Sequence, residues 1–226
     1  MPSQLIQQAE QLLLAVKMQK ETKVLVDQVS IGSARVLMTQ LDSDTQKKTF
    51  WINIYNTYYQ ILRQQGHNKP DIYRKRLFKV SGHNYSLDDV EHGILRKYRY
   101  KYSLGFLPNL LSKSRIKKLA VDKIDYRIHF ALNCGAVSCP PIAFYKVENL
   151  DAQLDLATQS FLESETVWDH DNKVAKVTAL FKWFYADFGN TKGIKEIYKN
   201  QLDVDMTGYS IKYREYSWED DLENFV

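Results

Sequence analysis

The sequence is poor in the residues that interrupt or cross-link a chain. Its 226 residues include nine glycines, five prolines and two cysteines. So little glycine and proline, with no low-complexity run, excludes a largely disordered chain or a long flexible linker. Two cysteines also cannot form the disulfide framework that holds many small secreted domains together. A folded globular protein is therefore expected.

Long apolar runs and strong charge of one sign are missing as well. No window approaches the roughly 18 uninterrupted apolar residues of a membrane span. The start, MPSQLIQQAE, lacks the charged region and apolar run of a signal peptide, although a removed leader would leave the same start. Thirty-one basic and 27 acidic residues give a net charge of +4, which does not imply a nucleic-acid partner. We expect a soluble, cytoplasmic chain.

The apolar residues that are present predict a mostly helical fold. Apolar positions at helical spacing predict a helix over residues 3–17 and a broken helix over 22–42. Ser43 and Gln46 form a capping box that opens a helix ending before Gly66. This helix is apolar on nearly every side, so it should be central, and its Asn53 and Asn56 amides should be buried and hydrogen-bonded. Each would anchor a neighbouring loop or orient a catalytic side chain.

The second half of the chain mixes helices with short strands. A hairpin is predicted over residues 77–87, and Ser86 should cap the helix that follows it. Further elements are a helix from residue 150, a strand over 174–178, an aromatic helix before Gly189, a helix over 193–198 and a closing strand over 211–218. The predicted fold is α+β: a mostly helical single domain around a small mixed or antiparallel sheet, with a papain- or transglutaminase-like arrangement as one option. Residues 1–44 form a helical segment packed on the main domain, residues 45–226.

Residues 125–142 hold the highest density of chemically special residues. The stretch reads D-Y-R-I-H-F-A-L-N-C-G-A-V-S-C-P-P-I and contains both cysteines. Read as a strand, R-I-H-F-A-L places Arg127 and His129 on one face. A tight turn would follow Cys134, and the Pro-Pro pair after Cys139 would place that sulfur near a helix N-terminus, which favours the nucleophilic thiolate.

These residues suggest thiol chemistry. Either cysteine could be the nucleophile, with Cys134 preferred for its glycine-flanked turn, and backbone N–H groups of the G-A-V-S turn could stabilise an oxyanion. The reaction would be acyl transfer: amide or thioester cleavage, or transfer to an amine or thiol of a small molecule or peptide. The candidate catalytic residues are Cys134, Cys139, the bases His129 and His92, and the orienting groups Asn53, Asn56 and Glu91. The candidate substrate-binding residues are Arg127, Arg96, Asn56 and Ser138.

Two other interpretations remain open. Cys134, Cys139, His129 and His92 could bind zinc, although the C-x4-C spacing is looser than that of common zinc sites. Alternatively the motif is structural, with buried thiols or a short-loop disulfide fixing a turn in a non-catalytic protein-interaction module. No cofactor and no metal is assigned, and whether the chain is an enzyme stays open at this point.

A basic and aromatic stretch covers residues 96–118. Interleaved tyrosines and cations can bind single-stranded nucleic acid by stacking and by phosphate contacts. The low net charge and the lack of a nucleic-acid motif favour a solvated connecting segment instead, whose long side chains cover apolar surface.

Four ordered motifs resemble one known family. These are F-W-I-N-I-Y-N, Y-S-L-D-D-V-E-H-G-I-L-R, the 127–142 stretch and F-K-W-F-Y-A-D-F. Together they resemble the family called domain of unknown function 547, over roughly residues 45–220. The chain departs from that pattern at Tyr126, where the family usually has proline, and after Trp218. The resemblance implies a fold neighbourhood and no reaction, so function must be argued from the site.

Overall fold

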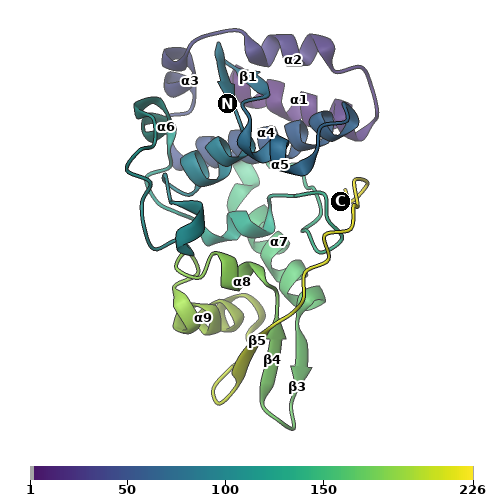
Figure 1. Ribbon diagram of the computed structural model, residues 1–226, viewed down its shortest axis with the longest axis vertical. Coiled ribbons are helices and arrows are strands. Elements are labelled where there is room, and N and C mark those ends of the chain that lie inside the picture. Colours follow the sequence, from purple (N-terminus) through teal and green to yellow (C-terminus); the bar gives the residue numbers. More distant parts are fainter. Residues whose placement is uncertain (1–2, 226) are drawn as a thin grey trace.

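The computed structural model describes residues 3–225, and helices dominate it. Helices α1 (Gln4–Lys17), α2 (Lys23–Ser30) and α3 (Ala34–Gln40) surround the long helix α4 (Asp44–Gln64) in the upper half of Figure 1. The helix predicted over residues 22–42 is indeed broken, since α2 and α3 are separated by Gly32 with a φ of 127°.

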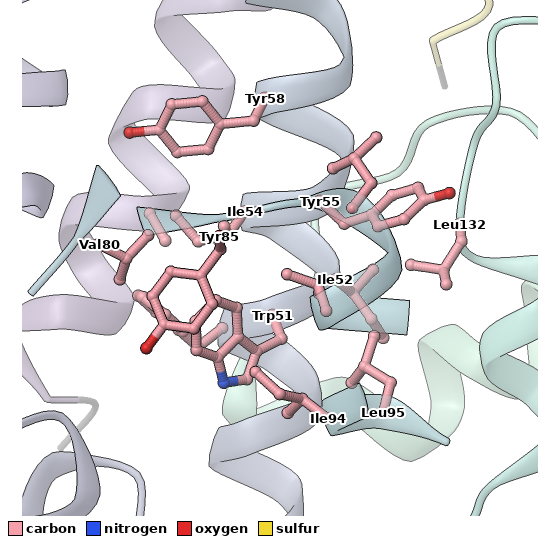
Figure 2. Packing of buried hydrophobic residues seen from close by; sticks show 14 of the residues in the cluster. Trp51, Ile52, Ile54, Tyr55, Tyr58, Val80, Tyr85, Ile94, Leu95 and Leu132 are labelled. Carbon is pink, nitrogen blue, oxygen red and sulfur yellow. The ribbon is translucent and has the colours of Figure 1, made fainter. Parts of the chain in front are cut away.

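Helix α4 is central for the reasons its sequence predicts. The Ser43 hydroxyl accepts a hydrogen bond from the Gln46 N–H at 3.3 Å, and the Gln46 side chain accepts one from the Ser43 N–H, so the capping box is confirmed. Trp51 is fully buried, and its indole packs against the ring of Tyr85 at 5.1 Å between centroids (Figure 2). Burying aromatic side chains of this size contributes on the order of 2–3 kcal/mol each.

The hairpin follows α5 (Lys69–Arg74), and a helix with wide turns follows the hairpin. Strands β1 (Phe78–Val80) and β2 (His83–Tyr85) pair antiparallel as predicted. Ser86 accepts a hydrogen bond from the Asp89 N–H at 3.1 Å and so caps the helical residues 87–88, which continue into the π-helix η1 (Asp89–Leu95). The Arg96 N–H donates to the Glu91 carbonyl, five residues back, which gives these turns their width.

The remaining elements include a second, mixed sheet, which lies at the lower end of the molecule (Figure 1). Strand β3 (Val167–Asp169) pairs antiparallel with β4 (Val174–Val177), and β4 pairs parallel with β5 (Ser210–Tyr213). The fold is therefore a mostly helical α+β domain with small sheets, as predicted. The elements are η2 (Lys101–Ser103), α6 (Ser114–Leu119), η3 (Tyr126–Phe130), η4 (Val147–Asn149), α7 (Leu150–Glu165), β3 (Val167–Asp169), β4 (Val174–Val177), α8 (Leu180–Trp183), α9 (Asn190–Leu202) and β5 (Ser210–Tyr213).

Two apolar clusters form the core, and the chain's last residues connect them. One cluster surrounds α4, and the other lies between α7, α8, α9 and the mixed sheet. After β5 the yellow C-terminal segment runs from the lower sheet back to the upper half of the molecule (Figure 1). We call residues 214–225 the C-terminal strap. Its backbone pairs with residues 134–139, which we call the cysteine turn. The Val137 N–H donates to the Glu219 carbonyl, and the Asp221 N–H donates to the Gly135 carbonyl.

The strand predicted for R-I-H-F-A-L is wrong. Residues 126–130 form the 3-10 helix η3. The Asp125 carboxylate accepts a hydrogen bond from the Arg127 N–H at 3.1 Å, and the same carboxylate binds the Arg127 guanidinium. This local cap offers the backbone an alternative to a strand ladder, so the residues coil and His129 enters the core beside Ile128 and Phe130.

Candidate functional site

A cavity of about 230 Å³ lies between the two apolar clusters, and motifs far apart in the sequence meet in it. Five of the predicted catalytic residues line it: Glu91, His92, His129, Cys134 and Cys139. The rest of its wall is Tyr55, Tyr73, Asp88, Leu132, Pro140, Leu180, Trp183, Phe184, Tyr216 and Trp218. Apolar cavities with a few converging polar groups are the usual form of a small-molecule site.

The sulfur atoms are joined in a disulfide. Cys134 and Cys139 lie with their Cα atoms 6.0 Å apart and form a bridge that closes the turn between them. The Tyr216 hydroxyl, on the C-terminal strap, lies 3.0 Å from each sulfur. Cys139 is 5% exposed, whereas Cys134 is half-buried, so Cys134 is the more exposed of the two residues.

Two features predicted for this turn are absent. No helix begins after Pro140 among the described residues, where the next helical turn is η4, so neither sulfur lies at a helix N-terminus. Most of the turn's N–H groups are also occupied. Gly135 N–H donates to the Asn133 amide oxygen, and Cys139 N–H donates to the Ala136 carbonyl. Of the four N–H groups of G-A-V-S, those of Gly135 and Val137 are occupied, so the expected oxyanion site loses half of its donors.

A buried chain of charged groups holds His129. Its Nε2 lies 3.0 Å from the Asp187 carboxylate, and Arg96 Nε donates to the same oxygen at 2.5 Å. Although burial raises the pKa of Asp187, the hydrogen bonds from His129 and Arg96 hold it below its ordinary value. Asp187 is therefore ionised, so His129 Nε2 carries the proton and Nδ1 is the basic nitrogen.

Both histidines are neutral near pH 7. Burial lowers the pKa of His129 to about 4, although its hydrogen bond to Asp187 acts in the opposite direction. Burial and the positive charge of Arg96 hold the pKa of His92 well below its ordinary value. Arg96 also donates to His92 Nδ1 at 2.8 Å, so His92 carries its proton on Nε2, which faces Asp88 at 3.6 Å. Of the two imidazoles, His129 is the one whose basic nitrogen is not already taken by Arg96.

Packing keeps the side chains of His129, Asp187 and Arg96 rigid. The Phe184 ring stacks on the His129 imidazole at 3.9 Å between centroids, and the Arg96 guanidinium lies 4.5 Å from the same ring. On the other side, Gly105 has a φ of 88° and its backbone packs so closely on the Asp187 carboxylate that a Cβ there would collide with it. Such packing is what fixes the orientation of a functional imidazole.

Glu91 is the acidic group of the cavity. Its carboxylate accepts a hydrogen bond from the Tyr55 hydroxyl at 3.1 Å. The pKa of Glu91 is raised to about 7, chiefly by burial. The positive charge of Arg96 lowers this pKa, and the negative charge of Asp88 raises it. The side chain can therefore both give and accept a proton near neutral pH. Adjacent Glu91 and His92 both line the cavity because the π-turns of η1 bring them to one side.

The raised pKa of Glu91 predicts a pH-dependent stability. Because the pKa of Glu91 is about 7 in the folded protein and 4.5, the ordinary value, in the unfolded chain, only the folded state binds a proton between these pH values. Folding is therefore penalised above pH 7, and the penalty disappears as the pH falls towards 4.5. Glu91→Gln should raise the free energy of unfolding by about 3 kcal/mol more at pH 8 than at pH 4.5. Urea unfolding at both pH values checks this, with exposed Glu196→Gln as control; equal effects at both would contradict it.

The buried amides of Asn53 and Asn56, predicted either to anchor a loop or to orient a catalytic side chain, hold backbone. Asn53 donates to the Tyr145 carbonyl at 2.8 Å and accepts from the Tyr145 N–H. Asn56 donates to the Ala131 carbonyl and accepts from the Asn133 N–H, both at 2.9 Å. Both amides therefore anchor loops, and the group that orients a histidine is Asp187. Asn56 still acts on the site, because Asn133 in turn holds the cysteine turn.

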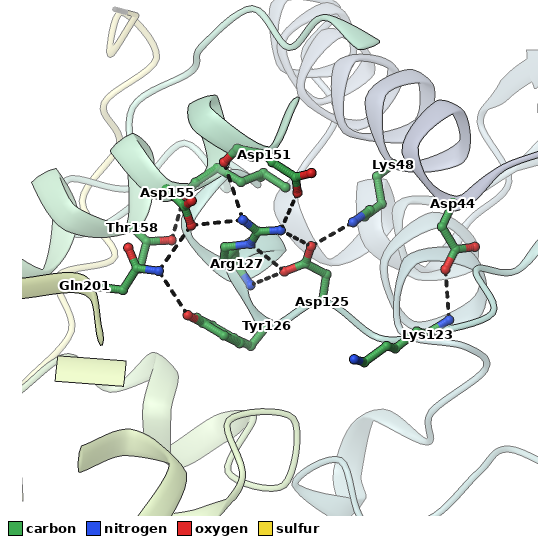
Figure 3. Close-up of polar contacts among 11 residues, drawn as sticks. Asp44, Lys48, Lys123, Asp125, Tyr126, Arg127, Asp151, Asp155, Thr158 and Gln201 are labelled. Carbon is green, nitrogen blue, oxygen red and sulfur yellow. Dashed lines mark hydrogen bonds and ion pairs between the residues drawn. The ribbon is translucent and has the colours of Figure 1, made fainter. Parts of the chain in front are cut away.

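The predicted substrate-binding residues point away from the cavity or are already paired. The Arg127 guanidinium binds Asp125, Asp151 and Asp155 (Figure 3). Arg96 is fully buried, and its guanidinium is bound to Asp187. The Ser138 hydroxyl accepts a hydrogen bond from the Ser217 N–H at 3.0 Å and so fixes the C-terminal strap. None of these three side chains lines the cavity.

Asp187 and Tyr216 are the functional candidates that sequence reasoning did not select. Asp187 belongs to the F-K-W-F-Y-A-D-F motif, so the resemblance marked the residue without giving it a role. Tyr216 lies in the alternating stretch predicted as a strand, and nothing in that pattern indicates contact with a sulfur 82 residues earlier.

The structure also offers neither a metal-ligand cluster nor a membrane-spanning helix among the described residues. Within residues 3–225 no cluster of three or more His, Cys, Asp or Glu side chains is placed to hold a metal ion. The disulfide also takes up both thiolates that a Cys/His zinc site needs. Over the same residues, every helix is too short or too polar to cross a bilayer.

Comparison with known proteins gives one match. The model of a family described as "Protein of unknown function, DUF547" matches residues 38–162, more than half of the chain. The match includes Glu91, His92, His129 and both cysteines and ends before Asp187 and Tyr216. No curated protein and no solved structure matches the chain.

Proposed function

Because the chain belongs to the DUF547 family of proteins of unknown function, its chemistry has to be inferred from its own cavity, and we propose that this cavity is the active site of a thiol-dependent acyl-transfer enzyme. One observation carries the proposal. A neutral histidine, oriented by a buried carboxylate, lines the same cavity as two cysteine sulfurs. A nucleophile, a base and a group that orients the base are the parts such catalysis needs.

The acyl-transfer form is the reduced one. A dithiol reductant would open the Cys134–Cys139 bridge and leave as its own disulfide, giving two thiols. His129 Nδ1 then takes the proton of the Cys134 thiol, and the sulfur attacks the acyl carbonyl. The amine or thiol leaves with the proton from His129, and a thioester remains on Cys134. Water, an amine or a thiol then attacks the thioester, and Cys134 regains its proton.

Each surrounding residue has a role in this scheme. Asp187, whose charge is balanced by Arg96, stabilises the imidazolium that forms on His129. The Tyr216 hydroxyl lies 3.0 Å from both sulfurs and would donate to the developing oxyanion in place of the occupied Gly135 and Val137 N–H groups. Glu91 would exchange protons with the acyl acceptor.

The cavity also limits the substrate. About 230 Å³ accommodates an acyl group or one side chain of a peptide, and the aromatic wall of Trp183, Phe184 and Trp218 favours an apolar one. We propose the cytoplasm as the compartment, because it keeps thiols reduced.

A second function is favoured by the disulfide itself. The bridge, the Asn133 amide and the strap together fix the turn, as expected of a structural motif in a non-catalytic protein-interaction module. In that case both sulfurs would be inert after reduction, and replacing either cysteine would lower stability without removing an activity.

Acyl trapping distinguishes the two functions. The protein is reduced with a phosphine, which is then removed, and treated with an acyl thioester at neutral pH, and each cysteine peptide is measured by mass spectrometry. We expect an acyl group on Cys134 at least about tenfold faster than on Cys139, since an activated thiol reacts ahead of a buried one. Cys139→Ala should still acylate. Slow and equal modification of both cysteines would contradict the enzyme and favour the structural role.

A further inference from the structure

The connecting segment of residues 97–118 has an unusual composition for a surface loop. It contains seven lysines and arginines and no aspartate or glutamate. Within the described residues Lys101, which pairs with Asp88, is the one cation of this segment in an ion pair with a carboxylate. The segment therefore presents a net positive charge that the rest of the protein leaves largely unbalanced.

The same segment exposes large apolar side chains. Seven of the seventeen large hydrophobic residues that are exposed in the described chain lie within the twelve residues 100–111. Leu110 is 78% exposed and Leu111 is 94% exposed. The others are Tyr100, Tyr102, Leu104, Phe106 and Leu107. Single exposed apolar residues are ordinary, but a contiguous group of them marks an interaction surface.

This exposure belongs to an ordered loop. Tyr100 N–H donates to the Leu107 carbonyl at 2.8 Å, and Asn109 N–H donates to the Tyr98 carbonyl at 2.6 Å, which closes the base of the loop. The Leu104 carbonyl accepts from the Ala186 N–H and ties the loop to the residue before Asp187. In Figure 1 the loop runs along the left edge of the molecule, below α6. The fold thus holds these apolar side chains towards solvent.

Cations lie directly against the apolar residues. Arg99 donates to the Phe106 carbonyl at 3.3 Å, and Lys117 donates to the Leu110 carbonyl at 3.0 Å. The Lys101 ammonium lies 5.2 Å from the Tyr102 ring centroid. Three exposed lysines follow Leu110 and Leu111 in the chain: Lys113 precedes the first residue of α6, and Lys117 and Lys118 lie in its last turn. Positive charge and apolar surface therefore occupy the same patch.

We propose that residues 97–118 form a docking surface for an anionic lipid bilayer. Leu110, Leu111 and Phe106 would enter the boundary between headgroups and acyl chains, while the lysines contact lipid phosphates and carboxylates. A bilayer fits better than a nucleic acid, because the most exposed residues are aliphatic leucines, which cannot stack on bases as aromatic rings do. The Leu104 carbonyl of the docking surface accepts a hydrogen bond from the Ala186 N–H, next to Asp187, which holds the cavity residue His129. Docking would therefore bring the cavity close to the membrane.

Vesicle sedimentation tests this proposal on the full chain. We expect binding to phosphatidylcholine vesicles that contain phosphatidylserine, little binding to phosphatidylcholine alone, and weaker binding at high salt. Leu110→Ser/Leu111→Ser should weaken binding at least about tenfold through lost apolar burial. Lys113→Ala/Lys117→Ala/Lys118→Ala should weaken it about 100-fold, roughly fivefold for each lysine. Two matched control variants change residues that are exposed outside the docking surface, and both should bind as the wild type does. They are Val24→Ser/Ile31→Ser for the leucine variant and Lys20→Ala/Lys23→Ala/Lys192→Ala for the lysine variant.

Several results would overturn the proposal. These are absence of binding to the anionic vesicles, unchanged binding by the leucine variant, or equal losses in the control variants. Self-association without vesicles that the leucine variant abolishes would assign the surface to a second copy of the chain. Salt-sensitive binding of single-stranded nucleic acid, tighter than vesicle binding and lost in the lysine variant, would assign it to nucleic acid. Because the altered residues are exposed, each variant should fold, and thermal unfolding checks this.

Discussion

His129→Gln is expected to lower the rate at which an acyl thioester acylates Cys134 by about 10²–10⁴-fold. Glutamine occupies a volume similar to that of histidine, and its amide can still donate to Asp187. It has no nitrogen that can accept the thiol proton at neutral pH. The change therefore removes the base and retains the hydrogen bond that His129 Nε2 makes in the core.

The matched control is His170→Gln, because His170 is exposed and contacts the Tyr209 hydroxyl in the lower part of the molecule. It should acylate at the wild-type rate. Mass spectrometry over a time course measures the rates, and circular dichroism confirms that both variants are folded. Wild-type acylation by His129→Gln would show that another group, or water, takes the proton.

Arg96→Met is expected to lower the free energy of unfolding by about 3–5 kcal/mol, because it leaves the Asp187 carboxylate buried without its cation. Arg96 is fully buried and Asp187 is 1% exposed at its side chain, so water cannot compensate for the lost charge. Urea unfolding at pH 7 measures the change.

A double variant separates lost charge from lost packing. Arg96→Met/Asp187→Asn removes both charges and keeps an amide oxygen that can accept from His129, so it should recover most of the loss. Lys192→Met removes the cation of the exposed Lys192–Glu196 pair and should change stability by less than about 1 kcal/mol. A loss as large in the double variant as in Arg96→Met would show that packing, and not charge balance, is what Arg96 contributes.

The elements that were predicted correctly are those whose signals are local. The Ser43–Gln46 capping box and the apolar surface of α4 lie within one stretch of chain, as do the two strands of the hairpin and the Ser86 cap. Such signals depend on neighbours a few residues apart, which any reader of the sequence can see. The 3-10 helix at residues 126–130 is the counterexample, because alternating apolar residues fit a strand equally well and the Asp125 cap decides between them.

The site was only partly predictable because its contacts span the chain. His129, His92, Glu91 and both cysteines stand out as reactive types, and the cavity brings all five together. Their partners do not stand out. Asp187 lies 58 residues from His129 and 91 from Arg96, and no local pattern indicates either contact. The same long range explains why the sequence predicts that Asn53 and Asn56 are buried and hydrogen-bonded but does not decide between anchoring a loop, which they do, and orienting a histidine.

The central claim is that a cavity thiol is activated by His129, and a crystal structure of the reduced protein tests it most directly. The distance between Cys134 Sγ and His129 Nδ1 is the quantity to measure. We predict that, once the bridge to Cys139 is open, this distance falls within about 3–4 Å, the range of a nucleophile and its base. If both sulfurs stay beyond that range and face away from the imidazole, the cysteine turn is structural and the acyl-transfer proposal fails.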